Sequence, residues 1–191
     1  MKFNIWSLLI IAIVLSVSSC EAKKEPVKKE VQKKAPAGYI INFKPNDSPD
    51  LVPPKTLILL QSPADGQNFF CLDVIAKKVD LISGVVFELN FDPAGVSYQS
   101  YKPGVLFEQK GKPVYQIGIK GDQKGNLAVR ISFESGNGGA SGSGKLVTLC
   151  FKALQPGRVG ILFENGELLD LQKKKMVGVT WVGGLLWVLE A

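Results

Sequence analysis

The chain has 191 residues, 46% of them apolar, which is enough for one domain of roughly 150 residues with a hydrophobic core. It contains no histidine, which excludes serine–histidine and cysteine–histidine nucleophiles and every histidine-ligated metal site, so we expect a protein that is not an enzyme. The formal charge of +6 lies mainly in residues 1–37, where seven Lys and three Glu give +4, and the nearly neutral remainder argues against nucleic acid as a partner.

Residues 1–19 have the pattern of an export signal. Met1 and Lys2 give a positive start, and residues 5–17 form an apolar run of 13 residues. A helix that crosses a bilayer needs about 20 apolar residues, so this run fits the apolar segment of a signal peptide better than a permanent span. We therefore expect residues 1–19 to be removed on export.

The sequence VSSC at residues 17–20 resembles the lipobox of bacterial lipoproteins. In that family a diacylglyceryl group is attached to the cysteine thiol and the signal is cleaved just before it, which implies lipidation of Cys20 by chains such as palmitate. The resemblance implies an exported protein anchored to the bacterial cell envelope. Glu21 stands where Asp often marks inner-membrane retention, which favours the outer membrane. The alternative is an ordinary secretory signal cut near Ser19 or Ala22, with Cys20 incidental.

Residues 20–38 are expected to form a tether between the lipidated cysteine and the domain. The segment has two prolines, six lysines and no apolar periodicity, so it cannot bury enough surface to fold. The lysines either keep this spacer solvated or bind anionic phospholipid headgroups. Residues 39–55 contain four prolines and are expected to be an ordered lead-in rather than a core strand.

From residue 56 onward, apolar residues recur at every second position in about nine short runs. Residues 84–91 and 127–133 are two of them, each with one apolar face. This pattern predicts an all-β fold over residues 56–191, a two-sheet antiparallel sandwich. The run 176–189 is expected to be the final strand, and the Gly- and Ser-rich segment 134–144 a flexible connection between strands.

Two motifs in this region resemble the cohesin module. Phe91-Asp92-Pro93 ends one strand, and the run at 144–153 is followed by Gln155-Pro156-Gly157. The resemblance covers roughly residues 56–190 and implies a jelly-roll sandwich of about nine strands, related to some carbohydrate-binding modules. Asp92 is expected to cap the turn that follows it, since a calcium site would need several more oxygen ligands.

Cohesins bind dockerin helices through one sheet face, and the resemblance assigns this face to outward positions of two strands. The implied partner-binding residues are Val86, Glu88, Asn90, Arg130, Ser132 and Glu134. Gly84 and Val86 depart from the polar residues that cellulosomal cohesins tend to have there. The alternative is an ordinary solvated sheet face.

The resemblance also makes the strands of Cys71 and Cys150 neighbours in one sheet. Alternation places both cysteines away from the core, and an exported chain lies in an oxidising compartment. We therefore predict a cross-strand disulfide, Cys71–Cys150; the alternative is two half-buried thiols.

The function implied is a membrane-anchored lipoprotein whose non-catalytic, cohesin-like module recruits a protein partner, which is dockerin-like or an envelope component. No metal or cofactor is expected. One alternative is a carbohydrate-binding module for polysaccharide, which calls for a flat row of exposed aromatics. Its candidates are Tyr98, Tyr101, Trp181 and Trp187, and both tryptophans are assigned to the core. The other alternative is a structural accessory of an envelope secretion or pilus apparatus.

Overall fold

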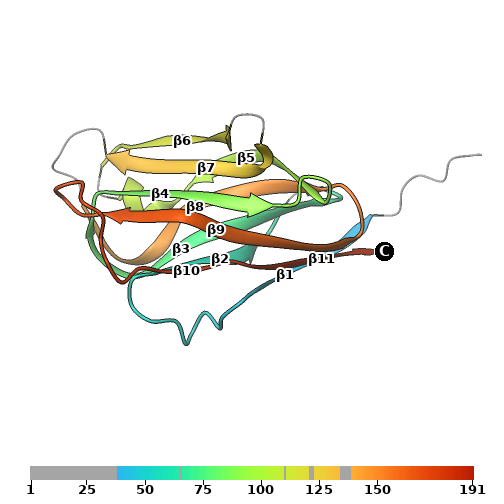
Figure 1. Cartoon of the computed structure of the whole chain (residues 1–191), viewed down its shortest axis with the longest axis horizontal. Helices are drawn as coiled ribbons and strands as arrows, with labels where there is room; N and C mark the ends of the chain where they lie inside the picture. The colour runs from blue at the N-terminus through green and yellow to red at the C-terminus, as the bar shows by residue number, and fades with distance from the viewer. Residues whose placement is uncertain (1–37, 65, 110, 121–122, 134–138) are drawn as a thin grey trace, which may run out of the picture. The chain divides into compact units, whose positions relative to one another are not determined.

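Two β-sheets packed face to face make up the fold (Figure 1). The computed structural model describes residues 38–64, 66–109, 111–120, 123–133 and 139–191, which belong to one compact unit. The predicted export signal, Cys20 and most of the predicted tether lie outside the described residues. Among the residues described, no helix is long and apolar enough to cross a membrane.

Sheet A has six strands in the order β1-β11-β9-β4-β7-β6, and sheet B has five in the order β10-β2-β3-β8-β5. Every pair is antiparallel except β10 with β2. The predicted two-sheet, all-β sandwich is therefore confirmed. The strands of sheet A are β1 (Tyr39–Pro45), β4 (Gly84–Phe91), β6 (Pro113–Lys120), β7 (Gln123–Phe133), β9 (Gly157–Leu169) and β11 (Gly184–Glu190). Those of sheet B are β2 (Thr56–Ser62), β3 (Phe69–Ile82), β5 (Val96–Pro103), β8 (Ala140–Ala153) and β10 (Thr180–Val182), and the one helix described is α1 (Val105–Glu108).

Alternating residues of the two sheets meet in a single core. On β4, Val85, Phe87 and Leu89 are fully buried, because successive side chains of a strand point to opposite faces of its sheet. Phe151 on β8 stacks on Phe70 and meets Phe91 of sheet A edge to face, so aromatic contacts join the two layers.

The domain begins earlier than residue 56, because β1 is a strand of sheet A and not a lead-in. Its seven residues pair with β11, and Phe43 is a core residue only 5% exposed. Pro45 ends the strand, and β1 lies at the edge of the sheet, where a missing N–H is tolerated. Proline density misled the prediction, since only one of the four prolines in residues 39–55 lies in the strand and it lies at the end.

Side-chain amides from β2 and from the turn before β3 satisfy the free edge of β1. Gln61 on β2 accepts a hydrogen bond from Phe43 N at 2.7 Å and donates one to Ile41 O at 3.2 Å. The side chain of Asn68 accepts from Tyr39 N at 2.8 Å. An unpaired edge strand is a template for aggregation, so these bonds protect the strand while they tie the two sheets together.

The C-terminal run forms two strands instead of the one expected. β10 pairs with β2 in sheet B, and the chain then crosses to sheet A, where β11 lies between β1 and β9. The crossing is at Gly183, where a Cβ atom would lie 2.5 Å from Ile161 O, so a residue with a side chain does not fit there.

The Gly- and Ser-rich segment is also partly a strand, since β8 begins at Ala140. It continues the pairing with the far end of β3, with register shifts. The hydroxyls of Ser143 and Ser141 accept hydrogen bonds from Lys78 N and Leu81 N, both at 2.9 Å. Serine side chains therefore replace backbone hydrogen bonds between β3 and β8 where the register shifts. The Gly- and Ser-rich composition alone does not predict this strand.

Candidate functional site

The outer face of sheet A holds the predicted partner-binding residues that the structure describes. Val86, Glu88 and Asn90 alternate with the buried residues of β4, and Arg130 and Ser132 alternate with those of β7. Val86 lies opposite Arg130, and Gly84 lies opposite Ser132. The structure therefore brings these five residues to one surface, which we call the sheet A face. Glu134 lies outside the described residues.

A hollow of about 270 Å³ lies on the sheet A face over β4, β7 and β6. The small side chain of Ala128, which lies opposite Glu88, lines this hollow. Charged and polar groups surround it. Its lining residues are Val86, Phe87, Glu88, Gln116, Ala128, Val129 and Arg130.

Glu88 is the most constrained charged group of this hollow, since three side chains from β6, β7 and β9 donate hydrogen bonds to its carboxylate. Lys120 Nζ lies 2.6 Å from Glu88 Oε1, and the Nδ2 atoms of Asn126 and Asn165 lie 3.2 and 3.3 Å from Glu88 Oε2. The bond from Lys120 is the main cause that lowers the pKa of Glu88 from its ordinary value, with Asn126 and Asn165 contributing and burial opposing. The carboxylate is therefore held ionised and in a fixed orientation.

Lys120, Asn126 and Asn165 were missed by the sequence prediction. Asn126 could have been found, because it continues the alternation of Ala128 and Arg130 by one more outward position. Asn126 is 5% exposed, and its Oδ1 atom has no hydrogen-bond partner among the described residues. Lys120 and Asn165 carry no such signal, since their approach depends on how β6 and β9 flank the central strands.

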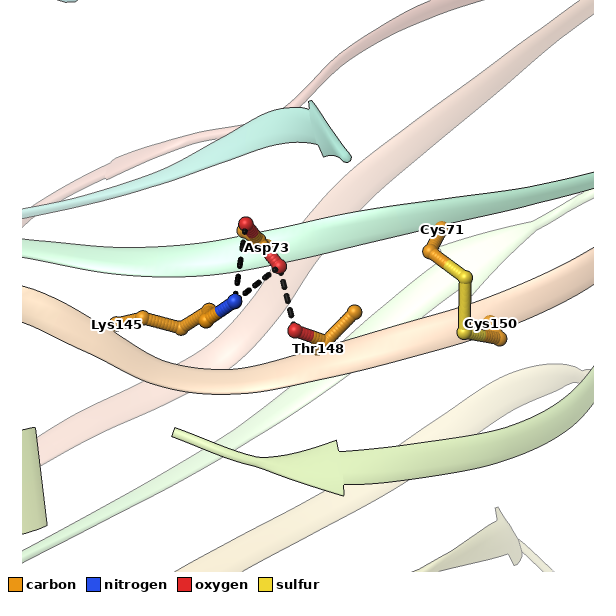
Figure 2. Close-up of a disulfide and its surroundings, with 5 residues drawn as sticks. All are labelled: Cys71, Asp73, Lys145, Thr148 and Cys150. Carbon is orange, nitrogen blue, oxygen red and sulfur yellow. Dashed lines mark hydrogen bonds and ion pairs between the residues drawn. A yellow bond between two sulfur atoms is a disulfide. The ribbon is translucent and has the colours of Figure 1, made fainter. Parts of the chain in front are cut away.

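The outer face of sheet B carries the two cysteines (Figure 2). Cys71 on β3 and Cys150 on β8 lie opposite each other and are joined by a disulfide. Neither belongs to the core between the sheets, in keeping with their alternation, yet they are only 4% and 8% exposed.

Beside the disulfide, Asp73 accepts a hydrogen bond from Thr148 Oγ1 at 2.5 Å, and Lys145 Nζ lies 3.4 Å from its Oδ1 atom (Figure 2). A carboxylate satisfied by a hydroxyl and an ammonium group on the adjacent strand is a structural arrangement. Within the residues described, no three His, Cys, Asp or Glu side chains come together to hold a metal ion.

Asp92 caps the turn after β4, as predicted. Its Oδ1 atom accepts from Ala94 N at 2.9 Å, and its carbonyl oxygen accepts from the amides of Gly95 and Val96. The carboxylate is thus used by the backbone of the Asp-Pro turn.

The four aromatic candidates for glycan binding do not form a row. Tyr98 packs on Phe151, Tyr101 stacks on Tyr115, and Trp181 packs against the core. Trp187, by contrast, was wrongly assigned to the core. Its neighbours Leu186 and Val188 are buried, so Trp187 points outward from β11, between Asn42 of β1 and Arg158 of β9.

Solved structures of cohesins share this fold. The second type II cohesin module from the adaptor ScaA scaffoldin of Acetivibrio cellulolyticus has 19% sequence identity and a TM-score of 0.54, over 68% of this chain and 87% of that one. A non-cellulosomal cohesin from the archaeon Archaeoglobus fulgidus has 15% identity and a TM-score of 0.51, over 65% and 82%. The sixth cohesin of scaffoldin B from Acetivibrio cellulolyticus, solved in complex with a Cel5 dockerin, has 16% identity and a TM-score of 0.52, over 68% and 96%. No protein-family model and no curated protein matches the sequence. At these identities the likeness concerns the fold, and the chain has a cohesin-like fold.

Proposed function

We propose that the protein is a non-catalytic docking module that binds a dockerin-type protein partner through the sheet A face. The observation that carries this proposal is the hollow bounded by Glu88 and Arg130. Glu88 presents a fixed carboxylate and Arg130 an exposed guanidinium, and both residues line the same hollow on neighbouring strands. Neighbouring charges of opposite sign on one sheet face favour recognition of a complementary protein surface, because they set register and orientation. The dockerin complexes of the structural neighbours support this class of partner.

The second part of the proposal is that Cys20 anchors this module at the cell envelope, in the outer membrane. It rests on the VSSC motif and on the lysine-rich segment that separates the motif from the domain. The mass of the mature protein tests it: a chain that starts at Cys20 and carries acyl groups supports the anchor. An unmodified chain that starts at Glu21 or beyond would refute the proposed lipid anchor.

Docking is tested by affinity capture on immobilised residues 38–191 from the envelope and secreted fractions of the native organism. We expect one protein in stoichiometric amount, whose retention is lost in the variant Arg130→Glu. The matched control is Lys102→Glu, an exposed charge on the outer face of sheet B, which should retain the partner. Equal retention by both variants would show that the sheet A face is not the docking surface.

Glycan binding is the second candidate function, since Trp187 faces outward beside an amide and a guanidinium. An indole face packs against the apolar face of a sugar ring, and such polar neighbours bond its hydroxyls. The same immobilised domain separates the two functions: retention of polysaccharide that is lost in Trp187→Ala, with no protein retained, would favour glycan binding.

A further inference from the structure

Exposed apolar side chains surround the point where the chain enters the domain. Ile40 and Leu189 lie opposite each other on β1 and β11 and are 57% and 55% exposed. Three more follow around the same end of the sandwich. We call this set the entry-end patch; its members are Ile40, Phe69, Ile119, Leu154 and Leu189.

Contacts across this end connect the members of the patch. Tyr39 donates from its hydroxyl to Leu154 O at 3.5 Å, and its backbone N–H bonds Asn68, the residue before Phe69. Leu154 and Ile119 line one hollow of about 340 Å³ between the edges of the two sheets. The five side chains therefore lie along the end of the sandwich at which β1 starts, from Ile40 and Leu189 at the β1 edge to Ile119 on β6 at the opposite edge of sheet A.

We propose that the entry-end patch rests on the surface of an anionic phospholipid bilayer. The proposal rests on the membrane anchor proposed above. Thirty-seven residues precede the described domain, and they join it at this end of the sandwich, where Ala191 N donates to Gly38 O at 3.0 Å. Both ends of the described chain therefore lie side by side (Figure 1), at the end of the sandwich that carries the patch. An anchor upstream of Gly38 makes this end of the sandwich the one nearest the membrane along the chain.

The chemistry of this end fits a lipid interface. Lys152 Nζ lies 5.8 Å from the centre of the Phe69 ring, which pairs an apolar ring with a cation that can contact lipid phosphate. Asp92 and Glu190 are exposed at the same end and repel anionic lipid, so the domain itself contributes apolar contact rather than a net charge attraction. The attraction for anionic lipid comes from the six lysines of the preceding segment.

Weak contacts suffice for this role because the tether supplies a high local concentration of membrane. Apolar exposure alone does not identify the surface, since Leu51 and Val177 are 84% and 83% exposed on loops remote from the chain entry. The position of the entering chain distinguishes the patch, and these two residues serve as matched controls.

The test anchors the domain without acylation. The chain contains no histidine, so in residues 21–191 with an N-terminal hexahistidine tag the nickel-chelating lipid of the vesicles is bound by the histidines of the tag alone. Amide hydrogen exchange is compared between the free protein and the protein on vesicles of phosphatidylethanolamine and phosphatidylglycerol. We expect exchange of the turns at 66–68 and 154–157 to slow about threefold or more on vesicles, and exchange at 46–55 and 170–179 to stay unchanged.

The double variant Ile40→Ser/Leu189→Ser should lose this protection, and Leu51→Ser/Val177→Ser should keep it. Equal exchange in the free and anchored protein would overturn the proposal. Protection that depends on protein density and appears equally on uncharged phosphatidylcholine vesicles would also overturn it, in favour of contact between two copies of the chain. Because the tag replaces Cys20, an unacylated mature protein would refute the proposed anchor without changing this result.

Discussion

Glu88 shows how neighbouring strands can hold one charged side chain on an otherwise open sheet face. Its side chain is 16% exposed, whereas that of its partner Lys120 is 51% exposed, so the carboxylate is the sheltered member of the pair. Donors from β6, from β7 and from Asn165 converge on it. A group held in this way loses little conformational freedom when a partner binds, which favours recognition.

The lowered pKa of Glu88 makes the stability of the domain depend on pH. A carboxyl group whose pKa is lower in the folded state contributes stability above its unfolded value, close to 4.5, and loses it as the pH falls through the folded value. At pH 7 we expect Glu88→Gln to be less stable than the wild type by about 1 kcal/mol or less.

Urea unfolding of both proteins from pH 7 to pH 3 measures this difference, which should shrink towards zero at the acid end. In the Lys120→Met background, the stability difference between Glu88 and Glu88→Gln should be smaller at pH 7 as well, because the bond from Lys120 is the largest cause of the lowered pKa. A difference that is constant over the whole range would contradict the role of the carboxylate charge.

At the scale of elements, the pairing of β3 with β8 is the longest in sheet B and carries the disulfide. The two cysteines are 79 residues apart, so the bond closes a long loop in the unfolded chain. The loop-entropy model gives a contribution of about 4 kcal/mol for such a loop. In residues 38–191 we expect Cys71→Ala/Cys150→Ala to lower the free energy of unfolding by up to about this amount.

Urea unfolding with and without reductant checks the prediction, since the reduced wild type should match the double variant. Thiol titration of the unfolded, unreduced protein should find no free thiols. Two free thiols per chain would refute the pairing, whatever the stability of the variant.

Strands with one buried face could be predicted from the sequence, and strands with other burial patterns could not. Alternation in β4 and β7 located both strands and their outward positions, because the side-chain period of two is visible in residues 84–91 and 127–133, and the resemblance to cohesins assigned these positions to one face. The switch between sheets at Gly183 interrupts an apolar run without a polar residue, so β10 and β11 read as one strand. The hydrogen bonds to Glu88 depend on packing between strands distant in sequence, which no local pattern contains.

For the whole molecule, β1 decides where the independent domain begins. It covers β11, whose other neighbour is β9, and it contributes Phe43 to the core between the sheets. Without it, β11 would be an edge strand with the apolar sequence LLWVL and no partner on one side. The sandwich is therefore complete only from residue 38 onward.

This predicts different behaviour for two fragments of the protein. Residues 38–191 should unfold in one cooperative transition, and residues 56–191 should be less stable by more than the loss of Phe43 alone, or should aggregate. Phe43→Ala within residues 38–191 measures the stability lost with the Phe43 side chain alone, which we expect to be about 3–5 kcal/mol for a buried Phe. Thermal unfolding and sedimentation velocity of the three proteins make the comparison. If residues 56–191 stay monomeric and unfold at the same temperature as residues 38–191, then β1 is dispensable and the domain begins at β2.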